Sequence, residues 1–226
     1  MSKVQPAPWS YSKLKSFQQC PKQFYHLKVA KDYKEPLTQA IYYGNAFHKA
    51  AEHYVQDGTP LPKKFMYAKK ALDSLIAKEG EKLCEYRMGL TANLDPCSFS
   101  SKDVWWRGIA DLIIMNKEEH SAKVVDYKTG KSAKYADKGQ LDLMALAMFK
   151  HFPELKKISG GLLFVVPQEL VTNSYIAEDQ TELWGQWTTD FMSLEAAFEN
   201  DVWNPNPSGL CKKHCVVLEC PHNGRG

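Results

Sequence analysis

Asp126 and Lys128 lie at the end of an apolar run, in the stretch KVVDYKTGK at residues 123–131. The run predicts a buried strand that emerges at the Thr-Gly turn. Side chains alternate along a strand, so this carboxylate and this ammonium face one side while Tyr127 faces the other. Such a pair at a strand end is either a solvated ion pair or part of an active site.

A second carboxylate supports the active-site interpretation. Residues 104–115, VWWRGIADLIIM, are apolar and β-favouring, and a polar turn joins them to the strand of Asp126. In the resulting hairpin Asp111 comes close to Asp126. Two carboxylates and an amine suit a metal-dependent phosphodiesterase, because carboxylates and a backbone carbonyl hold Mg²⁺, which polarises the phosphate and lowers the pKa of water. Lys128 would stabilise negative charge or position the attacking water.

The pattern predicts a mostly helical first third, then strands and helices, then an irregular tail, which together make an α/β protein with a central mixed sheet flanked by helices. Helices are expected over residues 9–20, from about Asn45 to Gly58, and over 62–80, 138–152 and 181–200. Strands are expected over residues 82–90, 104–115, 123–130, 158–166 and 169–177. Residues 204–226 are too rich in proline, glycine and asparagine for regular structure.

The composition is that of a globular protein, with 226 residues of which 44% are hydrophobic and 24% charged. A single domain over residues 1–226 is expected. No apolar run is long enough to span a membrane, and the first ten residues lack the apolar segment of a secretory signal, so we expect a cytoplasmic protein without a membrane partner. The net charge of +3 permits a nucleic-acid partner without arguing for one.

The six cysteines argue against a disulfide scaffold in a cytoplasmic chain and leave metal binding or simple burial. Cys211, Cys215 and Cys220 share one loop, with spacers of three and four residues. Three thiols in so short a loop suggest a bound soft metal. A further thiol, Cys20, ends the first predicted helix.

Four stretches in chain order, GNAFHKAAEHY, GIADLI, VVDYKTGK and GQLDLMAL, resemble the PD-(D/E)XK nuclease superfamily in its RecB-like and Cas4-like exonuclease branch, common in phages. The resemblance runs from SYSKLKSFQQCPKQFYH to the cysteine tail, nearly the whole chain. It implies a restriction-endonuclease-like nuclease core in residues 81–200, preceded by a helical segment in 1–80. Residues 201–226 would be a Cys-rich metal-binding tail that packs on the Cys20 region.

The resemblance also implies a catalytic site. Asp111 and Asp126 would be the metal carboxylates and Lys128 the catalytic lysine. Tyr127 would bind Mg²⁺ or Mn²⁺ through its backbone carbonyl, and His48 through its imidazole. Without the resemblance, His48 would be interpreted as a core or capping histidine.

Contacts to DNA are expected near this site. Gln140 opens the helix that carries Gln-x-x-x-Tyr in the family, where the glutamine touches DNA or supports the lysine; its alternative is a surface residue at a helix start. Met144 stands where the tyrosine is expected, which weakens the assignment of a DNA contact at that position. Trp106, Arg107 and Lys131 are expected to bind DNA, with core packing as the alternative for the tryptophan.

Iron–sulfur nucleases of this branch close a cluster with one cysteine before the core and three after it. The resemblance therefore implies a [4Fe–4S] cluster that joins the two ends of the chain. Its ligands would be Cys20, Cys211, Cys215 and Cys220. Zn²⁺ is the alternative, with His214 or His222 in place of a cysteine, and unoccupied thiols are the third interpretation.

The expected function is Mg²⁺- or Mn²⁺-dependent hydrolysis of DNA by an exonuclease of recombination, repair or phage DNA processing. The alternatives are a structure-selective endonuclease, an end-trimming factor like those of CRISPR adaptation, and a DNA-binding or interaction module that does not cleave. Linear duplex or single-stranded DNA, a single-strand annealing protein and further copies of the chain are the expected partners. A viral protein would act in the host cytoplasm.

Overall fold

The structure is a computed structural model that describes residues 8–225. These residues form two compact units. Residues Thr38–Trp184 make one, called here the sheet unit; the segments before Thr38 and after Trp184 make the other, called here the terminal unit.

Helices come first along the chain and strands follow, as the sequence predicts. The α-helices are α1 (Tyr11–Gln19), α2 (Pro21–Phe24), α3 (Gln39–Asp57), α4 (Lys69–Ile76), α5 (Gly139–His151) and α6 (Gln180–Asn200). A π-helical turn and 3₁₀ turns supplement them, at η1 (Tyr25–Val29), η2 (Lys63–Ala68), η3 (Ala177–Asp179) and η4 (Gly209–Lys212). The strands are β1 (Glu81–Leu90), β2 (Pro96–Cys97), β3 (Trp106–Asn116), β4 (Ser121–Lys128), β5 (Lys157–Phe164) and β6 (Glu169–Ile176).

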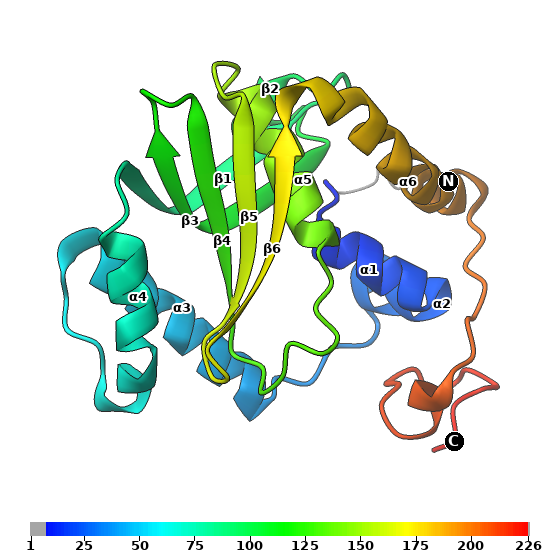
Figure 1. The fold of residues 1–226 in the computed structure, drawn as a ribbon. Helices are drawn as coiled ribbons and strands as arrows, with labels where there is room; N and C mark the ends of the chain where they lie inside the picture. The colour runs from blue at the N-terminus through cyan, green and yellow to red at the C-terminus, as the bar shows by residue number, and fades with distance from the viewer. Residues whose placement is uncertain (1–7, 226) are drawn as a thin grey trace. The chain divides into compact units, whose positions relative to one another are not determined.

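The strands form one mixed sheet in the order β2-β1-β3-β4-β5-β6 (Figure 1). Neighbouring strands are antiparallel except β4 and β5, which are parallel and are connected through α5. A parallel pair needs such a crossover, because its second strand starts at the opposite end of the sheet. The expected α/β fold with a central mixed sheet flanked by helices is confirmed.

Helices cover both faces of this sheet. On one face α3, η2 and α4 pack on alternate residues of the central strands, with Phe47 and Leu72 fully buried against Leu112 and Val125. On the other face α5 contacts β5, where Leu141 lies over Gly160. Tyr127 belongs to the first face, so the alternation along β4 sends Asp126 and Lys128 to the side of α5.

Helix α3 begins six residues before the predicted start near Asn45. Its N-cap is Thr38, whose hydroxyl accepts a hydrogen bond from the amide of Ile41 at 3.3 Å. Gly58 ends the helix in the left-handed conformation, as predicted. The glycine at position 44 concealed the true start, because glycine lowers helix propensity without preventing a helix.

Gly80 fixes the turn that leads into β1. Its φ is +116°, and a Cβ atom placed there would lie 2.5 Å from the carbonyl oxygen of Met115. Gly58 also has a positive φ, +73°, but within the described chain no atom outside its immediate surroundings would lie within 4 Å of its Cβ. A comparison of substitutions at the two glycines therefore distinguishes the cost of backbone strain from the cost of a steric clash.

We expect Gly58→Ala to lower the free energy of unfolding by about 1–2 kcal/mol, the cost of a left-handed residue with a side chain. Gly80→Ala should cost about 1–3 kcal/mol more, because the new methyl group also overlaps a backbone carbonyl. Equilibrium denaturation in urea measures both. Equal losses for the two variants would contradict the steric argument.

The terminal unit is organised around the ring of Trp203. This ring lies 6.1 Å from Phe24 in a stacked arrangement, measured between ring centroids, and further rings surround it. The surrounding rings are those of Phe17, Tyr25 and Phe198. The amide of Asn206 donates to the carbonyls of residues 18 and 19, so the start of the tail is fixed to the end of α1.

Among the described helices, none is both long and apolar enough to cross a membrane. The N-terminal segment in which we expect no secretory signal includes residues 1–7, which lie outside the described residues.

Candidate active site

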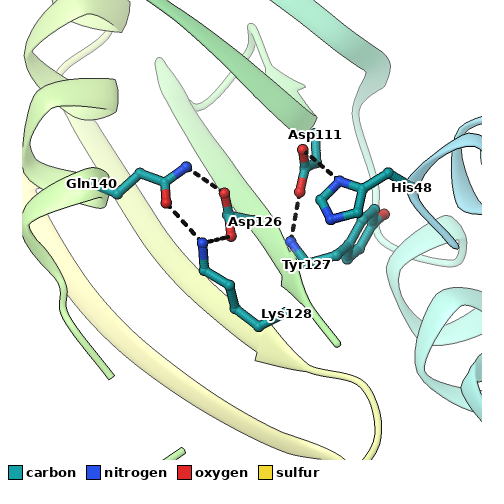
Figure 2. Close-up of polar contacts among 6 residues, drawn as sticks. All are labelled: His48, Asp111, Asp126, Tyr127, Lys128 and Gln140. Atoms are coloured by element: carbon teal, nitrogen blue, oxygen red, sulfur yellow. Dashed lines mark hydrogen bonds and ion pairs between the residues drawn. The ribbon is translucent and has the colours of Figure 1, made fainter. Parts of the chain in front are cut away.

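Strands β3 and β4 separate at the site. Their paired residues run from Asn116 and Ser121 to Leu112 and Val125, whereas β4 stays paired with β5 as far as Lys128. Beyond Val125 the amide of Tyr127 donates to the carboxylate of Asp111 instead, at 2.7 Å (Figure 2). The side chain of Asp111 therefore occupies the fork between the two strands.

Asp126, Lys128 and Gln140 form a closed triangle on the α5 side of the sheet (Figure 2). The Lys128 ammonium lies 2.7 Å from Asp126 Oδ2 and donates to Gln140 Oε1 at 2.8 Å. The Gln140 amide in turn donates to Asp126 Oδ1 at 2.5 Å. The Asp126 side chain is 9% exposed and that of Lys128 is 35% exposed, so the ammonium remains accessible to a ligand.

His48 reaches the fork from helix α3. Its Nδ1 lies 3.1 Å from Asp111 Oδ1, and its side chain is 31% exposed. The neighbouring Phe47 is fully buried, with its ring centroid 5.9 Å from that of Tyr127. Packing of Phe47 against β4 therefore holds the helix where His48 can meet Asp111.

The electrostatics of the fork are dominated by carboxylates. Burial, and then the charge of Asp111, raise the pKa of Asp126 to about 6. Burial lowers the pKa of His48, but the hydrogen bond to Asp111 and the surrounding carboxylates outweigh it, so the net pKa of His48 is raised. Neighbouring carboxylates contribute to both shifts, and a divalent cation bound at the fork would neutralise part of their negative charge.

The sequence model of the PD-(D/E)XK nuclease superfamily matches residues 8–221. The chain belongs to this superfamily. PD-(D/E)XK nucleases use divalent metals, and the ligand types gathered at the fork, carboxylate oxygen and imidazole nitrogen, suit Mg²⁺ and Mn²⁺.

Solved structures resemble this PD-(D/E)XK chain in fold. One, described as "Putative exonuclease" from Eubacterium rectale, is 14% identical, with a TM-score of 0.52 over 95% of this chain and 90% of that one. Another, designated SSO0001, is 14% identical, with a TM-score of 0.44 over 98% of this chain and 90% of that one. No curated protein matches the sequence.

The three residues predicted to bind DNA differ in their exposure to solvent. Arg107 is partly exposed on β3, with its guanidinium 5.1 Å from the ring centroid of Phe99. Lys131 is exposed in the loop after β4. Trp106 is only 1% exposed, with its ring against Gly108, so in this structure it packs in the core, the alternative interpretation, and offers little surface to DNA.

The structure adds Glu85 to the fork. One ligand atom from each of His48, Glu85 and Asp111 lies within 4.8 Å of the others, and no second such group of three metal-ligating side chains occurs in residues 8–225. The sequence around Glu85, KLCEYRMGL, has no metal-binding spacing. Only the pairing of β1 with β3 brings Glu85 opposite Asp111, so no local signal could have identified it.

A second group of potential ligands lies in the terminal unit. The side chains predicted to hold the iron–sulfur cluster all line one small cavity, together with Gln23, Asn206 and His222. Those four side chains are Cys20, Cys211, Cys215 and Cys220. His214 does not line this cavity.

Hydrogen-bond donors point at the sulfurs of this cavity. The backbone N–H of Asn206 donates to Cys20 Sγ at 3.5 Å, and that of Ser208 donates to Cys211 Sγ at 3.4 Å. The Gln23 amide donates to Cys215 Sγ at 3.7 Å. Donors of this kind favour thiolates, the form in which cysteine binds metals.

Proposed function

We propose that this protein is a divalent-metal-dependent deoxyribonuclease of the RecB-like and Cas4-like branch, acting as an exonuclease. The observation that carries the proposal is the fork, where Asp111, Asp126 and Lys128 meet on one edge of two separating strands. A protein that only bound DNA would need the ammonium but not the two buried carboxylates beside it. The structural likeness to a protein described as "Putative exonuclease" supports the exonuclease part.

The residues that would hold the cation are Asp111, Asp126, His48 and the backbone carbonyl of Tyr127. The bound cation would supply Lewis-acid polarisation of the scissile phosphate and a lowered pKa for water. The Tyr127 amide keeps the Asp111 carboxylate in the fork. The His48 imidazole must be neutral to bind a cation, so binding would displace the proton that the carboxylates favour.

Lys128 and Gln140 would act on the phosphate rather than on the cation. The Lys128 ammonium would stabilise the negative charge that develops on the phosphate oxygens. Asp126 and Gln140 hold that ammonium from two sides, so little reorganisation is needed when the substrate arrives. In this role Gln140 is a positioning residue.

DNA would reach the fork along the loop of residues 129–138, which joins β4 to α5. Lys131, Lys134 and Lys138 are all exposed there. Tyr135 is 85% exposed, with the Lys134 ammonium 5.3 Å from its ring centroid. Basic side chains interleaved with an exposed ring suit a single-stranded end, since the ring can stack on a base. Arg107 would contact the phosphate backbone from β3.

We also propose that the cysteine cavity holds a [4Fe–4S] cluster. The four predicted ligands line one cavity, and hydrogen-bond donors point at three of their sulfurs. One of these cysteines precedes the nuclease core and three follow it, as in the iron–sulfur nucleases that the chain resembles. This order supports the cluster over zinc.

With the cluster in place, residues 1–226 would work as one nuclease domain whose two chain ends are joined by iron. Both the cluster and the DNA substrate are compatible with a reducing cytoplasm, of the host if the protein is viral. A role in recombination, repair or phage DNA processing, beside a single-strand annealing protein, belongs to the same proposal.

The first experiment compares end-labelled linear duplex, linear single strand and closed circular DNA, each with Mg²⁺, Mn²⁺ or EDTA. The wild-type protein is tested beside Asp126→Ala and a control, Asp179→Ala, which changes an exposed aspartate. Metal-dependent loss of linear DNA that spares circles, and that Asp126→Ala alone abolishes, is the expected result. Cleavage of circles would make the enzyme an endonuclease. No cleavage by folded, metal-loaded protein would favour a binding module.

Gln140→Ala should lower the cleavage rate by about 10- to 100-fold, in the range typical of residues that orient a catalytic group. The loss should appear in kcat rather than in KM, because Gln140 contacts Lys128 and Asp126 rather than DNA in this proposal. Gln186→Ala, at an exposed position of α6, is the control. A change confined to KM would instead make Gln140 a DNA contact.

A further inference from the structure

Glu85 on β1 lies opposite Asp111 on the neighbouring strand β3. The residues on either side of Glu85 pair in register with β3, Cys84 with Leu112 and Tyr86 with Ala110. Glu85 and Asp111 are the facing positions between these pairs, and the regular pairing is interrupted there. The interruption leaves the two carboxylates at the same point of the fork.

The backbone of Glu85 is left-handed, with φ +47°. The other described residues with positive φ and a side chain lie in turns or loops, so Glu85 is the only one inside a strand in residues 8–225. A left-handed residue other than glycine costs about 1–2 kcal/mol. Strain of this kind gathers at functional sites, where the surrounding structure enforces it.

The position of the carboxylate is also costly in the absence of a cation. The Glu85 carboxylate is partly buried, with one of its oxygens within 4.8 Å of the carboxylate of Asp111. Glu52, one turn after His48 on α3, adds further negative charge. Backbone strain and charge repulsion thus both oppose the placement of Glu85, and a glycine or an asparagine would fit there at lower cost.

We infer that Glu85 is a side-chain ligand of the divalent cation, together with His48 and Asp111. This inference rests on the proposed function and adds a ligand to it. Two ligands at about 2.1 Å from one cation lie roughly 3 Å apart when adjacent in an octahedron. His48 Nδ1 and Asp111 Oδ1 are 3.1 Å apart, and a Glu85 oxygen completes the group within 4.8 Å.

The assignment adds a third carboxylate to the proposed cation site, beside those of Asp111 and Asp126. Both oxygens of Asp126 already have partners, the Lys128 ammonium and the Gln140 amide. Within residues 8–225 the Glu85 carboxylate makes no hydrogen bond or ion pair, and one of its oxygens lies within 4.8 Å of the ligand atoms of His48 and Asp111. With Glu85 and Asp111, two negative charges would match those of the cation, and Asp126 would share its charge between the cation and the Lys128 ammonium.

The test is Mn²⁺ binding to the full-length protein, measured by calorimetry and by the electron paramagnetic resonance of free Mn²⁺. Glu85→Gln should raise the dissociation constant at least about tenfold, since even residues that only support a ligand change affinity by 10- to 100-fold. The control is Glu81→Gln on the same strand, whose exposed carboxylate pairs with Lys117 at 2.9 Å. It should bind Mn²⁺ like the wild type.

A second variant separates a ligand from a structural residue. Glu85→Gly relieves the left-handed strain, so its metal-free form should melt at a higher temperature than the wild type. Its melting temperature should nevertheless rise less on addition of Mn²⁺. Wild-type affinity for Mn²⁺ in Glu85→Gln would overturn the assignment of Glu85 alone. Failure of the wild-type protein itself to bind Mn²⁺ would overturn the proposed metal site together with this inference.

Discussion

Replacing Lys128 by alanine is expected to lower the rate of DNA cleavage by about 100- to 1,000-fold, the usual cost of removing one charge-stabilising donor from an active site. The Lys128 ammonium is the accessible positive charge at the fork, and it contacts Asp126 at 2.7 Å and Gln140 at 2.8 Å. Its loss removes the group that would meet the developing negative charge. Single-turnover cleavage of end-labelled linear DNA measures the effect.

The matched control for this experiment is Lys123→Ala. Lys123 lies on the same strand, is exposed, and pairs within the regular part of the sheet. It removes the same charge from the protein without touching the fork. DNA binding, measured by fluorescence anisotropy in EDTA, should change little in either variant. If Lys128→Ala lost binding and cleavage to the same degree, the lysine would be a phosphate anchor instead.

The second large effect is expected at the cysteine cavity. Cys215→Ser should remove the iron and the acid-labile sulfide from anaerobically purified protein, because a hydroxyl is a poor ligand for iron in a cluster. The tail contributes few core residues of its own, so loss of the metal should leave much of it unfolded. Limited proteolysis should then cleave within residues 204–225, which the wild-type protein protects.

Cys97→Ser provides the control, because Cys97 lies in β2 of the sheet unit and does not line the cysteine cavity. It should keep its iron and its resistance to proteolysis. If the wild-type protein contained stoichiometric zinc, the cavity would be a zinc site rather than a cluster site. His222 would then be the available histidine ligand, because it lines the cavity. Metal-free wild-type protein with the same resistance as Cys215→Ser would leave the cysteines as free thiols.

The two proposals are independent in their tests, because the fork and the cysteine cavity belong to different units of the chain. A loss of cleavage in Lys128→Ala with full iron content would separate catalysis from cluster assembly. Loss of iron in Cys215→Ser with an intact sheet unit would show that the cluster stabilises the terminal unit. Reduced cleavage in that variant would then measure how far catalysis depends on the terminal unit.

Much of the fold follows from local patterns. The alternation in KVVDYK predicts that Asp126 and Lys128 share a face, and Gln140 meets both of them in the structure. The strands and helices after Gly80 fall close to their predicted positions, since apolar periodicity and glycine and proline boundaries are strong signals. The start of α3 is harder to predict from the sequence, because a capping threonine followed by weak helix formers is only a weak signal for a helix start.

The sequence by itself determined that Asp126 and Lys128 are candidate active-site residues and that both point to one face of β4, because side chains alternate along a strand with a period of two. Only the tertiary structure decided that Trp106 is buried. Helices cover both faces of the sheet, so the sequence of a strand does not show whether a given side chain is exposed to solvent. The tertiary structure alone also decided that Glu85 joins His48 and Asp111, because that meeting depends on the register between β1 and β3. The alternation along a strand indicates which face it buries, but which residues of two strands stand opposite each other depends on how the strands pair.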